Sequence, residues 1–340
     1  MRTFKIILKL LSSLRTPFHA DTLFGHFCWA MRFLEGEEAL KAWLDGFEAS
    51  PTLISNGFLK GRFPRPLTRP LSLAQLGKLL SFDPDAPPTP EKVIIAGRLK
   101  KLKKKSMIEE QWFRDNRENL SPEILVSMLY KQVKEEETQD EKKTTRKRRQ
   151  EEMAVMHNTF NRQEGRVLEG GLYEFDELCY LDEQDQPEQF WFLVQSETLD
   201  EKRLAALMEF IGHSGFGADK STGKGVIEVE GIEDYPIPEC KNPNAFVSLS
   251  NFIPAKPEEL NGYYQPLTKY GKLGGEYAAG YNPFKKPLVM LQAGALIKDE
   301  SFTPEKRYGK LQTGVHKDAK IKHYGYGFPI AVHYQESADE

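Results

Sequence analysis

Residues 215–225 read GFGADKSTGKG and hold the residue types that bind phosphate groups. Glycines let the main chain approach an anion closely, and successive main-chain N–H groups can form an anion-binding concavity. The lysines would add positive charge. The stretch therefore predicts a phosphate-binding loop; the alternative is a mobile loop whose glycines only make turns. The candidate ligands of a phosphate are Gly215, Gly217, Lys220, Ser221, Gly223, Lys224 and Gly225.

The spacing of this glycine loop differs from the two common nucleotide-binding patterns. A Walker loop has four residues between its first glycine and the Gly-Lys pair, but five residues separate Gly217 from Gly223. In the dinucleotide pattern G-x-G-x-x-G, a glycine would stand where this chain has Lys220. Both patterns come directly before a helix, whereas this loop follows one. The loop belongs to neither class, although its glycines and lysines can still bind a phosphate.

The glycine loop lies between regular elements. Residues 189–195, QFWFLVQ, are typical of a buried strand, and residues 198–201 form a capping box that begins a helix. Residues 226–229, VIEV, predict a strand after the loop. The apolar positions at helical spacing are Leu204, Leu207, Met208 and Ile211. The predicted order is strand, helix, glycine loop, strand.

The beginning of the chain supplies the other half of this pattern. Alternating apolar residues from Phe4 to Leu10 predict a first strand rather than an export signal. A helix capped by Asp21 or Thr22 follows, and the proline-rich residues 51–70 are expected to be largely extended. Residues 1–232 therefore give the ferredoxin-like order β-α-β-β-α-β with a long insertion, which predicts an α+β fold.

The insertion, residues 98–156, carries two strongly basic runs. These are KKLKKK at 100–105 and KKTTRKRR at 142–149, and a helix is expected to begin at Ser121-Pro122 between them. We interpret the insertion as partly helical and partly mobile, and as thumb-like in form; the alternative is a solvated, charged loop.

Residues 240–336 predict a second, degenerate ferredoxin-like domain. Strands are expected near 246–249, 287–296 and 324–332. The stretch YYQPLTKYGKLGG at 263–275 alternates rings and charges, as a platform for single-stranded nucleic acid does. The expected fold class is therefore α+β with two ferredoxin-like domains.

Composition limits the classes of function. The net charge is −3, so a nucleic-acid surface has to be sought locally. Three scattered cysteines favour a reducing compartment and argue against a structural zinc site. No stretch approaches the roughly 20 apolar residues of a membrane span. We expect a cytoplasmic protein with no membrane partner, no metal site and no cofactor.

Few residues suggest catalysis. The histidines never form a metal-ligand pair at helical spacing, and no nucleophile elbow is present. His26 could be the general base of a metal-independent ribonuclease, with Lys220 stabilising the phosphorane. A packing or surface role is favoured for this histidine, and no catalytic residues are expected.

Signals for binding are more numerous. Amide and guanidinium groups in the HNTFNR segment suit base edges and phosphates, and arginines stand in a stiff, proline-spaced segment. Their coincidence with the glycine loop favours RNA as the ligand. The further candidate RNA-binding residues are His157, Asn158, Asn161, Arg162, Arg62 and Arg65.

Taken in order, these motifs resemble those of the fourth subunits of the Csm complex, the type III-A CRISPR effector, in the RAMP superfamily of ferredoxin-like RNA-binding proteins. The glycine loop after the second helix is the hallmark of that superfamily. The resemblance covers nearly the whole chain. It rests on HADTLFGHFCWA at 19–30, LISNGFLKGRFPRP at 53–66, KKLKKK at 100–105, HNTFNRQEGRVLEGGLYEF at 157–175, the glycine loop, KLGGEYAAGYNPFKKPLVML at 272–291 and YGYGFPIAV at 324–332.

The resemblance implies a non-catalytic subunit that holds the 5′ tag of the CRISPR RNA (crRNA) in antiviral defence. It implies docking to the large polymerase-like subunit and contact with a backbone RAMP subunit. The glycine loop would face the RNA, and His157, Asn158 and Arg162 would contact it. Two alternatives stay open: a metal-independent RAMP endoribonuclease that processes CRISPR RNA, with His26 or His157 as base, and a pure protein-interaction scaffold. The equivalent subunit of the type III-B complex is closely related and differs in its partners more than in its mechanism.

Overall fold

A five-stranded antiparallel sheet forms the centre of the protein. The computed structural model describes residues 1–141, 149–182, 184–255, 260–279 and 282–336. The strands of the sheet follow the order β2-β8-β1-β9, and β3 also pairs with β8. Their bounds are β1 Arg2–Leu10, β2 Leu53–Ile54, β3 Phe58–Leu59, β8 Gln189–Ser196 and β9 Ile227–Asp234. The mixture of this sheet with helices confirms the α+β class.

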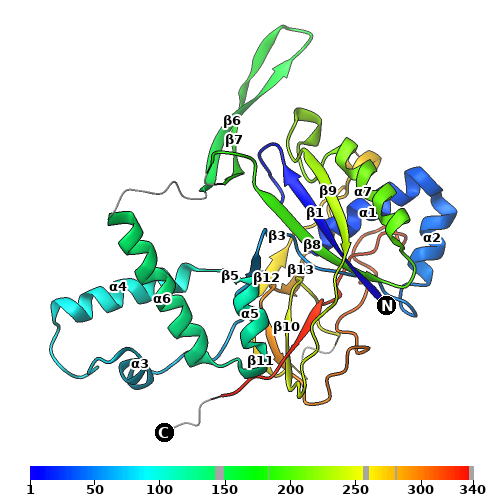
Figure 1. Ribbon diagram of the computed structural model, residues 1–340. Helices are drawn as coiled ribbons and strands as arrows, with labels where there is room; N and C mark the ends of the chain where they lie inside the picture. Colours follow the sequence, from blue (N-terminus) through cyan, green and yellow to red (C-terminus); the bar gives the residue numbers. More distant parts are fainter. Residues whose placement is uncertain (142–148, 183, 256–259, 280–281, 337–340) are drawn as a thin grey trace.

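Two helices pack together against this sheet (Figure 1). They are α1 (Ala20–Glu35) and α7 (Glu201–Ser214), and α2 (Glu37–Asp45) lies against α1. Helix α1 begins one residue before the expected caps, with His19 at the N-cap position. Asp21 does not cap the helix, because its carboxylate lies 3.0 Å from Nζ of Lys269 in the C-terminal part of the chain.

The region between residues 62 and 141 is largely helical, so helices begin well before residue 98, where the insertion was expected to start. Its elements are β4 (Arg62–Pro64), α3 (Leu73–Leu80), α4 (Pro90–Lys104), β5 (Met107–Glu109), α5 (Glu110–Asn116), the 3₁₀ turn η1 (Arg117–Asn119) and α6 (Pro122–Glu141). Part of the first basic run is neutralised, because Lys101 and Lys105 on α4 and its cap pair with Glu137 and Glu136 on α6. The second run, 142–149, lies almost entirely outside the described residues.

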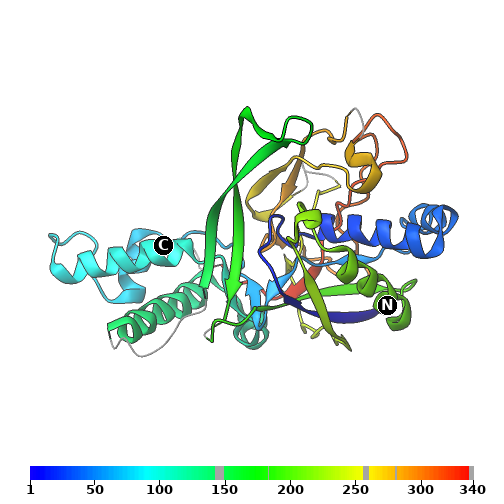
Figure 2. The same cartoon turned by 90° about the horizontal axis from the view of Figure 1, so that it is seen from above.

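A long two-stranded hairpin projects from the body (Figures 1 and 2). It consists of β6 (Arg149–Asn161) and β7 (Arg166–Leu181). By sequence alone, the polar residues after His157 lead through Gly165 and Gly170-Gly171 into a short expected strand at 172–175. In the structure the HNTFNR segment is itself part of the hairpin, since cross-strand pairing extends the ladder almost to the turn.

The C-terminal part contributes two further small sheets. One has the order β11-β14-β10-β15, and the other pairs β12 with β13. The bounds are β10 Ala245–Ser248, β11 Gly262–Tyr263, β12 Pro266–Lys269, β13 Leu288–Leu291, β14 Leu296–Lys298 and β15 Pro329–Val332, with a 3₁₀ turn, η4, at Gly275–Ala279. Strands are thus found in all three expected regions.

One hydrophobic core joins the N-terminal and C-terminal parts. Its buried residues come from both sides of the boundary expected near 232–240, and they include Phe24 and Tyr324, whose ring centroids lie 5.2 Å apart. The Tyr324 hydroxyl also accepts the N–H of Ile54 at 2.7 Å. The two parts are therefore packed into one body, and the assignment of each to the ferredoxin-like class stays a prediction.

Candidate nucleic-acid interface

Glycine is required at two positions of the loop for steric reasons. Gly217 and Gly225 both have positive φ angles, +79° and +63°. A Cβ atom at Gly217 would lie 2.8 Å from Cβ of Thr16, and one at Gly225 would lie 1.9 Å from the carbonyl oxygen of Phe216. The glycines thus let the loop fold tightly upon itself and upon the segment after β1.

Most main-chain N–H groups in the loop already have partners. The N–H of Gly217 donates to Nε2 of His26 at 3.0 Å, and the N–H of Ala218 donates to Oγ1 of Thr16 at 3.1 Å. Gly225 donates to the carbonyl of Ser13 at 2.9 Å, and Thr222, Gly223 and Lys224 donate to carbonyls within the loop. These amides are not available as an anion cradle. The exposed residues of the loop are Ala218, the 3₁₀ turn η2 (Lys220–Thr222) and Gly223, so the side chains of Lys220 and Ser221 are open to solvent.

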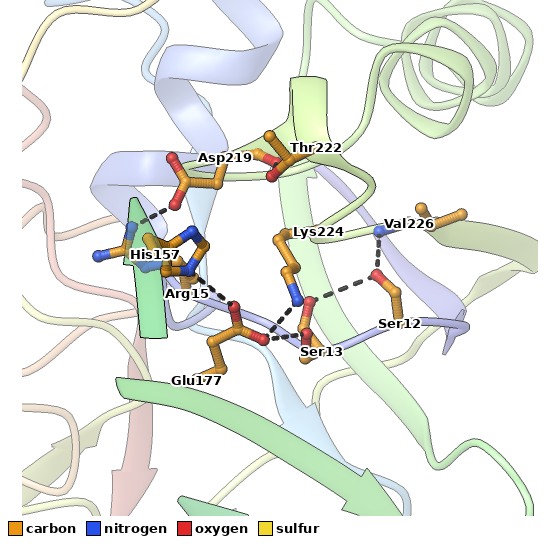
Figure 3. Close-up of polar contacts among 9 residues, drawn as sticks. All are labelled: Ser12, Ser13, Arg15, His157, Glu177, Asp219, Thr222, Lys224 and Val226. Carbon is orange, nitrogen blue, oxygen red and sulfur yellow. Dashed lines mark hydrogen bonds and ion pairs between the residues drawn. The ribbon is translucent and has the colours of Figure 1, made fainter. Parts of the chain in front are cut away.

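A buried carboxylate joins the glycine loop to the projecting hairpin (Figure 3). Oε2 of Glu177, on β7, lies 2.6 Å from Nζ of Lys224 and accepts a hydrogen bond from Oγ of Ser13 at 2.6 Å. Oε1 of the same residue lies 3.8 Å from Nε2 of His157. Burial opposes the ionisation of Glu177, whose side chain is 1% exposed, but the hydrogen bonds from Lys224 and Ser13 outweigh it and lower its pKa. Lys224 therefore serves first as the partner of this carboxylate.

A second cation lies between the loop and the hairpin. Arg15 pairs with the carboxylate of Asp219 in the loop, and its guanidinium lies 3.5 Å from the ring centroid of Phe175 on β7. Asp219 has a left-handed backbone conformation, with φ at +57°. The sequence interpretation missed both Arg15 and Glu177. Arg15 stands shortly before the segment 19–30 and Glu177 shortly after the segment 157–175, and no local pattern singles out either residue.

The hairpin presents aromatic and polar side chains. The ring of His157 stacks on Tyr173 at a centroid distance of 5.5 Å and an interplanar angle of 8°. Asn158 and Arg162 are exposed, further towards the turn. Asn161 instead stabilises the turn, because its Oδ1 accepts the N–H of Gln163 at 3.0 Å.

His26 lies beneath the glycine loop, which the sequence did not indicate. Its ring stacks on Phe216 with centroids 4.6 Å apart, and its Nε2 accepts the Gly217 N–H. Burial, together with the nearby charge of Lys220, lowers the pKa of His26 to about 3. The imidazole is therefore neutral near pH 7, and the lone pair that a general base would use is already engaged.

Two of the candidate arginines are engaged elsewhere. Nη1 of Arg65 donates to the carbonyl of Leu102, at the end of α4, at 2.9 Å, and burial lowers the pKa of Arg65. Arg62 lies 4.0 Å from Glu109 on the paired strand β5. The structure thus brings His157 and the loop together through Glu177, but gives Arg65 the role of a helix cap.

Comparisons with known proteins support the fold. No family model matches the chain, and no curated protein matches it. Among solved structures, the Csm1-Csm4 cassette in complex with AMPPNP matches over 98% of this chain and 100% of the other, with a TM-score of 0.54 and 17% identity. The same cassette in complex with cA4 gives a TM-score of 0.52 at 18% identity, again over 98% and 100% of the two chains. The Csm3-Csm4 subcomplex of the type III-A CRISPR-Cas interference complex gives 0.54 at 16% identity, over 98% and 100%.

The chain therefore has an α+β fold of the kind found in the type III-A CRISPR-Cas interference complex. More particularly, it is similar over its full length to the Csm4 chains of these assemblies. The resemblance inferred from the ordered motifs is confirmed at the level of the fold. None of the helices in the described residues is long and apolar enough to cross a bilayer.

Proposed function

We propose that the protein is a non-catalytic, RNA-binding subunit of a type III-A CRISPR effector complex. In this role it holds the 5′ tag of the crRNA and docks the large polymerase-like subunit and a backbone RAMP subunit. The observation that carries the proposal is the junction at Glu177, which fixes the glycine loop against the projecting hairpin in a chain with the fold of Csm4. The known assemblies pair Csm4 with Csm1 and with Csm3, which supports the two protein partners.

The RNA is proposed to lie between the loop and the hairpin. Lys220 and Ser221 are exposed and offer an ammonium and a hydroxyl group to phosphate oxygens. On the hairpin, the stacked rings of His157 and Tyr173 offer a surface on which an unpaired base can stack. Asn158 and Arg162 offer hydrogen-bonding groups near the turn. In this proposal the side chains contact the RNA, and the glycines set the conformation of the loop.

The alternative, a metal-independent endoribonuclease, finds less support in the geometry. Nε2 of His26 is occupied by the Gly217 N–H, and His157 faces the Glu177 carboxylate rather than open solvent. We therefore favour a packing role for His26 and an RNA-binding role for His157.

The proposal is tested by crRNA retention in the assembled complex. Lys220→Glu should weaken binding of a 5′-tagged RNA by about 1–3 kcal/mol and lower the dependence on salt, because one phosphate contact is lost. Lys202→Glu, on the exposed side of α7, is the matched control and should leave retention unchanged. Equal retention by both variants would contradict the RNA-facing role of the loop.

Incubation of the protein with repeat RNA in EDTA tests the alternative. The RNA should stay intact. Cleavage at one position that disappears in His26→Gln would establish the nuclease in place of the binding subunit.

A further inference from the structure

A groove lies between α7 and β9, beside the free edge of the central sheet. Figure 1 shows these two elements next to each other. Its volume is about 700 Å³, and it lies on other elements than the Glu177 junction. In the described residues β9 pairs with β1 alone, so it is the last strand of its sheet. An uncovered edge strand offers main-chain groups to another strand.

The register of β9 identifies the groups that face outward. The N–H of Leu11 donates to the carbonyl of Val226 at 2.8 Å, so Val226 turns towards the neighbouring strand. Pairing in an antiparallel ladder alternates from residue to residue. Ile227 and Val229 therefore direct their N–H and C=O groups away from β1, towards the groove.

Helix α7 lies over part of this edge. Of the α7 residues that line the groove, Ala205 and Gly212 are small, whereas Glu201, Glu209 and His213 are large and polar. A Cβ atom added at Gly212 would touch the carbonyl oxygen of Ile227 at 3.4 Å, so the helix contacts the strand there. Ile227 is buried and Val229 is partly exposed, so an additional strand would pair from Val229 onwards.

The rim of the groove carries glutamates both on α7 and on β9. Glu201 and Glu209 come from α7. Glu228 and Glu230 come from β9, where Glu228 stands opposite Lys9 of β1 and Glu230 accepts a hydrogen bond from Nε2 of Gln189. No lysine or arginine is among the residues that line the groove. Such a surface repels nucleic acid and also disfavours edge-to-edge pairing with a second copy, which would bring like charges together.

We propose that the free edge of β9 binds an extended, basic segment of a protein partner as an additional strand. Main-chain hydrogen bonds to Val229 and the residues after it would supply affinity, and the glutamates would select lysine and arginine side chains. This inference does not depend on RNA binding, because it concerns a different surface.

The test uses the full-length protein and a synthetic peptide that alternates lysine with valine over about six residues, the usual length of a strand. Binding is measured by fluorescence anisotropy, and protection of the β9 amides is measured by hydrogen exchange. The control peptides carry glutamate in place of lysine, or methyl groups on alternate main-chain nitrogens. The lysine peptide should bind and protect residues 229–232, and both controls should fail to do so.

Two protein variants separate main-chain pairing from charge. Val229→Pro removes an outward N–H without removing a hydrogen bond to β1, and should weaken peptide binding about tenfold. Glu209→Lys should weaken peptide binding by a similar factor. It should change neither the stability of the fold nor the retention of RNA. Glu300→Lys, exposed and outside the groove, is the matched control and should bind as the unchanged protein does.

The proposal is overturned if the lysine peptide binds both variants unchanged, or if it leaves the amides of 229–232 unprotected. Equal binding of the glutamate peptide would also overturn it, since the charge argument would then be wrong. A dimer of this chain, seen by sedimentation and abolished by Val229→Pro, would assign the edge to a second copy instead.

Discussion

Nζ of Lys224 lies 2.6 Å from Oε2 of Glu177, and this contact attaches the glycine loop to the base of the projecting hairpin. The carboxylate is almost fully buried, so its charge depends on the partners that surround it. Removing one member of a buried charge pair leaves the other without compensation, which is costly. The relationship makes the position of the hairpin relative to the loop sensitive to a single side chain.

Glu177→Gln should loosen the hairpin and lower the free energy of unfolding by about 2 kcal/mol, because Lys224 loses its counter-charge. Hydrogen exchange should become faster at the base of β6 and β7, and chemical denaturation gives the change in stability. Glu174→Gln is the matched control, since this exposed glutamate lies on the same strand. Equal effects of the two substitutions would show that the buried carboxylate does not hold the hairpin.

Gly225→Ala should be strongly destabilising, by about 3 kcal/mol, since it combines a left-handed backbone with a clash against the carbonyl of Phe216. Gly223→Ala should cost only about 1 kcal/mol, because Gly223 has a positive φ but no neighbour within 4 Å of an added Cβ. Thermal and chemical unfolding measure both. A Gly225→Ala protein as stable as the Gly223→Ala protein would refute the close approach inside the loop.

Acid should destabilise the protein through His26. Burial lowers the pKa of His26 from 6.5 to about 3. Between these pH values the unfolded chain binds a proton at His26 and the folded protein does not. Stability is therefore full above pH 6.5 and falls as the pH decreases towards 3, by about 2 kcal/mol at pH 5 for this one residue. The pKa values of His19 and His323, both lowered to about 4 by burial, add to the same trend.

The contribution of His26 is isolated with His26→Gln, which keeps an acceptor for the Gly217 N–H but does not titrate. Unfolding free energies measured between pH 7 and pH 5 should show a smaller decrease in this variant. An identical decrease in both proteins would mean that His26 is not the residue that takes up the proton.

Arg65→Ala should reduce stability rather than RNA affinity. Arg65 donates to the carbonyls of Leu102 and Lys105 at the end of α4, so its loss leaves these groups without their partner and costs about 1–3 kcal/mol. Denaturation measures the stability, and crRNA retention measures the affinity. A loss of RNA with no loss of stability would return Arg65 to the RNA-binding residues that the sequence suggested.

The sequence by itself determined the local elements that position the site. Alternation in residues 4–10 and the apolar run at 189–195 place β1 and β8, because the burial of a strand repeats every two residues. The positive φ angles in the loop after α7 are also determined locally, since glycine adopts them without strain. The ordered motifs also led to the Csm4-like fold.

Only the tertiary structure decided which charged groups meet. Glu177 pairs with a lysine 47 positions away, and Arg15 pairs with an aspartate 204 positions away. No periodicity records such contacts, because they depend on the packing of segments that are distant in the chain. For the same reason the sequence suggested RNA contacts for Arg65 and for the loop amides, whereas packing engages both within the protein. Local propensity therefore fixed the elements, and long-range packing decided which side chains remain free to meet a ligand.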